Sequence, residues 1–181
     1  MREIALHIFD LLENSVRAHA SEVTLTVAEL ISEDRYEVTI ADNGDGISPT
    51  LLPRVTDPFY TTRTTRKVGM GLPLAKMCAE QAGGGLTITS KEGVGTTLHM
   101  WFQRSHWDCP PLGDIDGAVA LFFSTHPTLH LIYICRNEQE ELVFNSGDIM
   151  DILEGHRLDQ EVLYRVLLEA LREGRHPWDG E

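Results

Sequence analysis

The chain has 181 residues, of which 42% are hydrophobic and 24% charged, as in an ordinary soluble globular protein. No window approaches the roughly 18 to 20 apolar residues of a membrane span, and residues 1–20 hold acids that a signal peptide lacks. Three cysteines, an odd and sparse set, favour a reducing cytoplasm over a disulfide framework. We therefore expect a cytoplasmic protein without a membrane span, long enough for one full domain and a smaller second one.

The negative charge is concentrated in the C-terminal part of the chain. The net charge is -13 overall, of which residues 1–104 carry -3 and residues 105–181 carry -10. Such a surface repels nucleic acid and anionic lipid, so we expect no nucleic-acid partner and favour a basic protein surface. Acidity that only maintains solubility is an alternative of equal weight.

Residues 3–18 have the apolar spacing of an amphipathic helix. Asp10 and Asn14 are four residues apart, so they share a face of this helix. A cleft-facing Asn needs a partner for its amide, and a hydrated Mg²⁺ is one such partner. On this segment alone, an Asn14 that caps the helix or faces solvent is the preferred alternative. His7 has apolar neighbours and is expected to pack in the core.

Residues 22–29 and 35–41 alternate in polarity and are rich in β-branched side chains, which predicts two strands. The second strand runs into a turn at 42–47, where an acid precedes each of two glycines. Asp42 therefore stands at a strand end, where its carboxylate can accept a hydrogen bond from a ligand amine. An ordinary turn explains Asn43-Gly44 but leaves the repeated acid–glycine pair unexplained.

Residues 48–68 are predicted to form a long loop with a short helix near 51–55, and their Thr/Arg cluster, Phe and Tyr favour a lid over a ligand. Gly69 and Gly71 then open onto a helix predicted for 71–81. Such a turn lets the backbone approach a ligand closely, and the free N–H groups of the first helical turn favour a phosphate. Alone this pattern is weak evidence for a phosphate site, because a helix C-cap followed by a second helix has the same sequence pattern.

Residues 86–90 and 97–103 are predicted strands around a tight turn, and their pairing should bring Thr96 towards Asp42. A linker at 105–113 precedes residues 114–181, a small acidic α+β domain of unknown role. Its predicted elements are helices at 114–124, 149–153 and 159–173 and strands at 130–136 and 141–145. A zinc site can be drawn from His106, Cys109, His126 and His130, but their spacing fits no compact ligand pair.

Residues 1–103 resemble the GHKL ATP-binding superfamily of gyrase, the heat-shock chaperone ATPase, histidine kinases and the mismatch-repair ATPase. Five stretches match the family's motifs, in the family's order and at plausible spacing. The resemblance rests on the five matches together. They are an Asn box at 7–18, a first glycine box at 42–47, a lid box at 57–63 similar to that of the mismatch-repair ATPase, and further glycine boxes at 67–76 and 93–97.

This resemblance implies an α/β fold: a two-layer sandwich, the Bergerat ATP-binding fold, with a mixed, mainly antiparallel sheet and helices on one face. The small C-terminal α+β domain follows it. Implied ligands are ATP and Mg²⁺, with Asn14 holding the metal and Asp42 accepting from the adenine amine, assisted by Thr96. The remaining implied ATP contacts are Gly44, Gly46, Ile47, Phe59, Arg63, Lys67, Gly69, Met70, Gly71 and Leu72.

Departures from the family pattern bear on the activity. Hydrolytic members carry a Glu one turn before the Asn as general base, and here the shorter Asp10 takes that place as the catalytic candidate. Glu13 points about 100° away from Asn14 on the helix and is the poorer candidate. Residues 1–6 leave no room for a preceding phosphoacceptor hairpin, and no transducer domain follows, so we expect the acceptor on a partner protein.

The sequence therefore predicts a cytoplasmic, ATP·Mg-dependent protein kinase of the histidine-kinase-like type, with a homodimer left open. Two alternatives remain. One is an ATPase switch that hydrolyses ATP to water while the lid creates a protein-binding surface. The other is a non-catalytic nucleotide-sensing module that binds a partner.

Overall fold

The structure is a computed structural model that describes residues 3–57, 71–152 and 158–173. Of the expected ATP contacts, Phe59, Arg63, Lys67, Gly69 and Met70 lie outside these residues.

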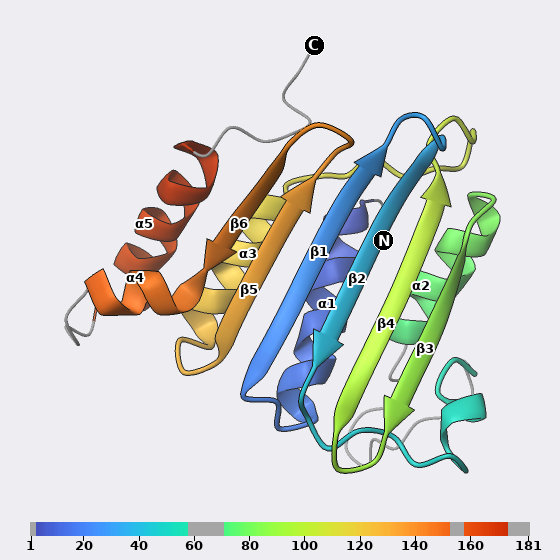
Figure 1. Cartoon of the computed structure of the whole chain (residues 1–181), viewed down its shortest axis with the longest axis horizontal. Helices are drawn as coiled ribbons and strands as arrows, with labels where there is room; N and C mark the ends of the chain where they lie inside the picture. The colour runs from blue at the N-terminus through green and yellow to red at the C-terminus, as the bar shows by residue number, and fades with distance from the viewer. Residues whose placement is uncertain (1–2, 58–70, 153–157, 174–181) are drawn as a thin grey trace.

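The described residues form one mixed sheet of six strands, in the order β3-β4-β2-β1-β5-β6 (Figure 1). Among the strands of the described residues, only β1 and β5 pair in parallel, and the other neighbours are antiparallel. This confirms the predicted mixed, mainly antiparallel sheet. The strands are β1 (Glu22–Leu30), β2 (Arg35–Asp42), β3 (Gly85–Lys91), β4 (Gly95–Gln103), β5 (His130–Arg136) and β6 (Glu141–Asn145).

Helices line up behind one face of this sheet (Figure 1), where α5 packs on α3, α3 on α1 and α1 on α2. None of the helices in the described segments is long and apolar enough to cross a membrane. The helices are α1 (Ile4–Arg17), α2 (Gly71–Gln81), α3 (Ile115–Thr125), α4 (Ser146–Ile152) and α5 (Gln160–Glu173), with a 3-10 turn at Leu52–Arg54.

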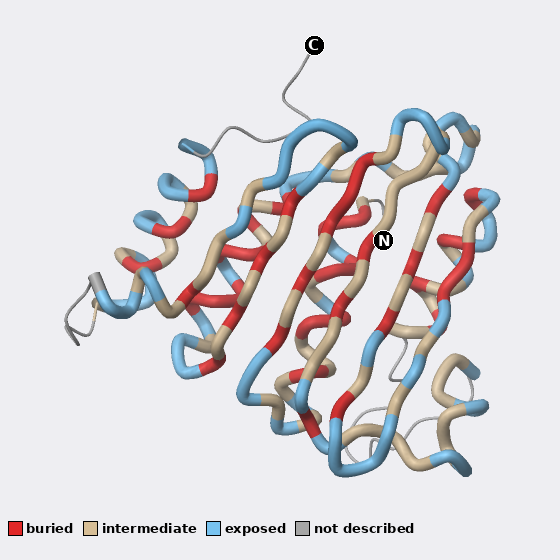
Figure 2. The backbone as a smooth tube through the Cα atoms, in the orientation of Figure 1, coloured by how far each residue is buried: buried red, intermediate tan, exposed pale blue. Residues whose placement is uncertain are grey.

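The hydrophobic core lies between the sheet and the helices, and the central strands contribute alternate residues to it. Inward residues of β1 and β2 are buried while their neighbours are more exposed, as the banding of the strands in Figure 2 shows. The apolar stripe of α1 meets them at helical spacing. Each buried aliphatic side chain contributes on the order of 1.5–3 kcal/mol. The central set is Ile4, Ile8, Leu12, Val23, Leu25, Val27, Val38 and Ile40.

Strands β5 and β6 extend the main sheet and do not form a sheet of their own. The buried residues Leu131 and Tyr133 of β5 lie opposite Val23 and Leu25 of β1. Local sequence patterns predict a strand but do not specify its partner, which is why the sequence did not reveal this pairing. Buried residues of α3, β5 and α5 belong to the same core as those of α1 and β1, and a division into two domains at residue 104 stays a prediction.

The segment predicted as a linker completes the start of α1. Glu3, the N-cap residue, makes no side-chain cap hydrogen bond. Instead, the carbonyl oxygens of Pro111 and Leu112 accept from the backbone N–H groups of Ile4 at 3.0 Å and Ala5 at 2.9 Å. The first N–H groups of a helix lack partners within it, so these acceptors tie α1 to the segment that follows β4.

His7 is the unusual residue of the α1 core. Its side chain is 1% exposed, and neither ring nitrogen has a hydrogen-bond partner among the described residues. Burial, the main cause, lowers the pKa of His7 below its usual value of 6.5, while the charge of Asp10 acts in the opposite direction. The folded protein therefore favours the neutral imidazole.

We predict that acid destabilises the wild type more than a His7→Leu variant. Below about pH 6.5 the unfolded chain binds a proton at His7 more readily than the folded protein, so the free energy of unfolding falls with pH. The extra loss is at most about 1.4 kcal/mol per pH unit. Urea titrations near pH 7.5 and 5.5, followed by circular dichroism, measure it. The same pH dependence in both proteins contradicts this role for His7.

Candidate functional site

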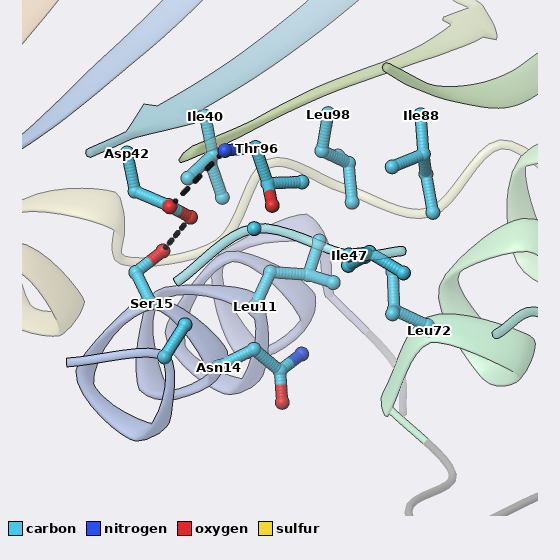
Figure 3. Close-up of a pocket in the computed structure, with 12 residues that line it drawn as sticks. Leu11, Asn14, Ser15, Ile40, Asp42, Ile47, Leu72, Ile88, Thr96 and Leu98 are labelled. Atoms are coloured by element: carbon cyan, nitrogen blue, oxygen red, sulfur yellow. Dashed lines mark hydrogen bonds between the residues drawn. The ribbon is translucent and has the colours of Figure 1, made fainter. Parts of the chain in front are cut away.

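A cavity lies between α1, the start of α2 and the ends of β2, β3 and β4 nearest the 42–47 turn. Its walls are mostly aliphatic, and its polar groups come from a few side chains (Figure 3). An apolar slot with a few fixed polar groups is typical of a small-molecule site. The lining residues are Leu11, Asn14, Ser15, Ala18, Ile40, Asp42, Gly46, Ile47, Leu72, Ile88, Thr96 and Leu98.

The carboxylate of Asp42 is held by donors from three segments. Oδ2 accepts from the hydroxyl of Ser15 at 2.9 Å, and Oδ1 accepts from the backbone N–H groups of Gly44 at 3.0 Å and Thr96 at 3.2 Å. Two of these bonds are dashed in Figure 3. An ionised carboxylate is acceptor-only, and Oδ2 retains a free acceptor position. This end of the cavity therefore fits a ligand that presents a donor, such as an amine.

Thr96 lies directly opposite Asp42 in the ladder between β2 and β4. The sequence predicted that the two residues approach each other, and they do. The contact arises from the pairing of β4 with β2, because β3, on the other side of the tight turn, pairs with the far edge of β4.

Ser90 joins the 42–47 turn to the two strands beside it. Its Oγ accepts from the N–H of Ile47 at 2.8 Å, donates to the carbonyl of Gly95 at 2.9 Å and lies 2.9 Å from Oγ1 of Thr96. The polar end of the cavity is thus one connected hydrogen-bond network.

Close backbone packing explains the glycines of this turn. A Cβ built on Gly44 would lie 2.4 Å from the carbonyl oxygen of Ala18, and one built on Gly46 would lie 2.1 Å from that of Lys91. Gly46 also has a φ of +69°, a conformation that other residues rarely adopt. The turn therefore lies flat between the end of α1 and the β3–β4 turn.

Asn14 and Asp10 lie on the side of α1 that faces α2. Asn14 lines the cavity, and its Oδ1 accepts from Nη1 of Arg17 at 3.1 Å. In Figure 3 its amide points away from Asp42. Asp10 is exposed and adjoins the start of α2, since a Cβ built on Gly71 would lie 3.6 Å from Cβ of Asp10. Leu72, the next residue of α2, lies in the cavity wall.

Glu13 is engaged elsewhere. Its carboxylate lies 3.6 Å from Nε2 of His126, the C-cap residue of α3, and 3.9 Å from Nη2 of Arg17. Arg17 thus contacts both Glu13 and Asn14, and the lesser role expected of Glu13 stays a prediction. In the described residues, no group of three or more His, Cys, Asp or Glu side chains is arranged to hold a metal ion.

Sequence reasoning missed most of the aliphatic wall of the cavity and three polar residues in or beside it, namely Ser15, Ser90 and Arg17. Ser15 occupies a buried position of the α1 stripe and is 2% exposed, and Ser90 follows Leu86 and Ile88 on the inward face of β3. A polar residue at an inward position needs a partner, and this signal was available for both serines. Arg17 carried no such signal, because a basic residue in the last turn of a helix is common.

Comparison with protein families gives a match over residues 2–106 to the family described as histidine kinase-, DNA gyrase B- and HSP90-like ATPase. The chain belongs to this family. The matched residues include every strand and helix around the cavity. Members are enzymes of the kinase or ATPase type, and the α/β fold agrees with this membership.

Among curated proteins, the chain is 33% identical over 95 residues to the sensor histidine kinase ZraS of Salmonella typhi, covering 52% of this chain and 20% of ZraS. It is 37% identical over 96 residues to the sensor protein SrrB of Staphylococcus aureus, covering 49% and 16%. The chain thus matches only about a fifth of the length of these relatives.

Among solved structures, the ATPase domain of Aquifex aeolicus MutL complexed with ADP aligns with a TM-score of 0.53 at 15% identity, covering 85% of this chain and 70% of that one. The N-terminal domain of a DNA repair protein aligns with a TM-score of 0.58 at 13% identity, covering 79% and 52%. At these identities the likeness concerns the fold alone.

We predict that Gly46→Ala lowers the free energy of unfolding by about 2 kcal/mol or more, because it adds a backbone clash to a strained φ. Gly93→Ala is the matched control, with a φ of +72° but no atom within 4 Å of the added Cβ. It should cost only about 1 kcal/mol. Urea denaturation measures both, and equal losses would show that the contact with Lys91 is unimportant.

Proposed function

We propose that the cavity binds ATP with its adenine amine at Asp42. The observation that carries this proposal is the acceptor-only end of an otherwise aliphatic slot, in which Oδ2 of Asp42 keeps room for one more donor. The aliphatic walls suit the faces of a purine. Thr96 assists at the base, while Gly44, Gly46 and Ile47 let the turn pass close to the base and ribose.

The phosphates then extend towards α2. The N–H groups of its first turn, at Gly71 and Leu72, have no acceptor within the helix, and such groups favour phosphate oxygens. For Mg²⁺ the donor chemistry fits, because Oδ1 of Asn14 is a hard oxygen at the cavity and Mg²⁺ takes few protein ligands beside phosphate and water. Bound there, the ion would neutralise phosphate charge. Arg17, now bonded to Oδ1 of Asn14, is a second cation within reach of this end.

The activity we propose is phosphoryl transfer from ATP to a partner protein, as the similarity to sensor histidine kinases favours. Such a transfer depends mainly on orientation and charge stabilisation. Asp10 is exposed beside the start of α2, so its carboxylate is accessible to take the proton of an incoming nucleophile. In the alternative ATPase switch, the same carboxylate acts on water. The nucleotide-sensing module needs no base at all.

The phosphoacceptor is proposed to lie on a separate protein in the cytoplasm, with a homodimer still open. Residues 105–181 carry a net charge of -10, which favours a partner with a basic surface.

We predict that Asp42→Asn lowers ADP affinity at least tenfold, because a hydrogen bond to a charged group contributes about 1.5–3 kcal/mol. The amide nitrogen of Asn would also face the donors that now converge on the carboxylate. Asp45→Asn, an exposed acid in the same turn that pairs with His19, is the matched control and should bind normally. Calorimetry with ADP and Mg²⁺ measures both variants. Unchanged affinity in Asp42→Asn refutes the nucleotide site.

We predict that Asp10→Asn keeps ATP affinity but loses turnover, because only the proton acceptor is removed. Incubation with γ-labelled ATP, with and without co-purified partner proteins, measures it. Label on a protein supports the kinase, free phosphate alone supports the ATPase switch, and tight binding with neither supports the sensing module. Persistent turnover in Asp10→Asn excludes Asp10 as the base.

A further inference from the structure

Ser90 has a fully determined set of hydrogen bonds. A hydroxyl has one hydrogen to donate and two lone pairs that accept. One lone pair receives the N–H of Ile47 at 2.8 Å. The carbonyl oxygen of Gly95, at 2.9 Å, can only accept, so it takes the hydroxyl hydrogen of Ser90.

This assignment settles the direction of the remaining bond. Oγ1 of Thr96 lies 2.9 Å from Oγ of Ser90. Since the hydrogen of Ser90 is used at Gly95, the hydroxyl of Thr96 must donate to Ser90. The opposite direction would leave two oxygen lone pairs, those of Ser90 and Gly95, in contact without a hydrogen between them. Oγ1 of Thr96 consequently offers only lone pairs to the cavity that it lines.

The side chains at the polar end of the cavity then offer a ligand only hydrogen-bond acceptors. Asp42 is acceptor-only with three donors already in place, and Thr96 is made acceptor-only by Ser90. In Figure 3 the Asp42 carboxylate and the Thr96 hydroxyl lie side by side at this end. A base with an exocyclic amine is accepted there. A base with a carbonyl oxygen in that position meets only lone pairs, and such a mismatch leaves buried acceptors unpaired.

We propose that Ser90 is a specificity-determining residue, which selects adenine over 6-oxopurines by holding the Thr96 hydroxyl as an acceptor. Ser90 touches neither base nor phosphate in this proposal and acts through Thr96, so it is a positioning residue. The inference rests on the proposed nucleotide site. It adds a residue on β3, a strand to which the sequence assigned no ligand contact.

The test compares ADP with inosine diphosphate, which replaces the exocyclic amine by a carbonyl oxygen and carries a hydrogen on the neighbouring N1; sugar and phosphates are identical. Calorimetry gives the ratio of the two affinities for each protein. In Ser90→Ala, the Thr96 hydroxyl is free to rotate and donate to the carbonyl, so the preference for ADP should fall about fivefold, as for one neutral hydrogen bond. Ser90→Thr keeps a hydroxyl and should restore the preference.

A double-mutant cycle separates this role from a merely structural one. In a Thr96→Val background the hydroxyl is absent, so Ser90→Ala should leave the ratio unchanged. Thr89→Val is the control on the opposite, exposed face of β3 and should leave the ratio at the wild-type value. A wild-type ratio in Ser90→Ala, or an equal fall in the Thr96→Val background, overturns the inference. If the wild type binds neither diphosphate, the proposed function itself fails.

Discussion

The half-buried carboxylate of Asp42 is the point on which the geometry of the site depends. Its three donors come from α1, from the 42–47 turn and from β4, which are distant in sequence. All three bonds form together only when β4 pairs with β2 in the observed register and Ser15 faces the sheet. A one-residue slip would turn Thr96 to the other face of the sheet. Strand register and ligand chemistry are therefore specified by the same contacts.

Helix α1 connects this polar end of the cavity to the start of α2, where Asp10 lies. Its helical period assigns a different task to each face. Ile4, Ile8 and Leu12 pack on the sheet, Asn14 lines the cavity, and Asp10 remains exposed beside α2. A rotation of the helix would disturb the core packing, the cavity wall at Asn14 and the position of Asp10 together. A substitution that shifts this helix would therefore change both the core and the cavity.

Much of the fold and several site residues were predictable from the sequence, because they depend on local patterns. Apolar spacing predicted α1 and α2, and alternation predicted the strands to within a residue or two. The acid–glycine turn pointed to Asp42. The pairing of β3 with β4 across their tight turn was predicted, but pairing between strands distant in sequence was not, and so the place of β5 beside β1 and the pairing of β4 with β2 emerged only from the structure. Ser15 and Ser90 were missed because their role is to hold another side chain.

The carbonyl groups of Pro111 and Leu112 bear on whether the segment that holds the nucleotide-binding motifs can fold without the rest of the chain. All five motifs end before residue 104, so the motifs alone would suggest residue 104 as the end of a truncated or fused protein. A chain cut there would retain each motif but remove the acceptors for the first turn of α1 and the strand that covers the edge of β1. An uncovered edge strand is a surface for aggregation. These contacts connect residues 1–104 to the part of the chain that follows, so we expect a chain cut at residue 104 to be less stable than the full chain.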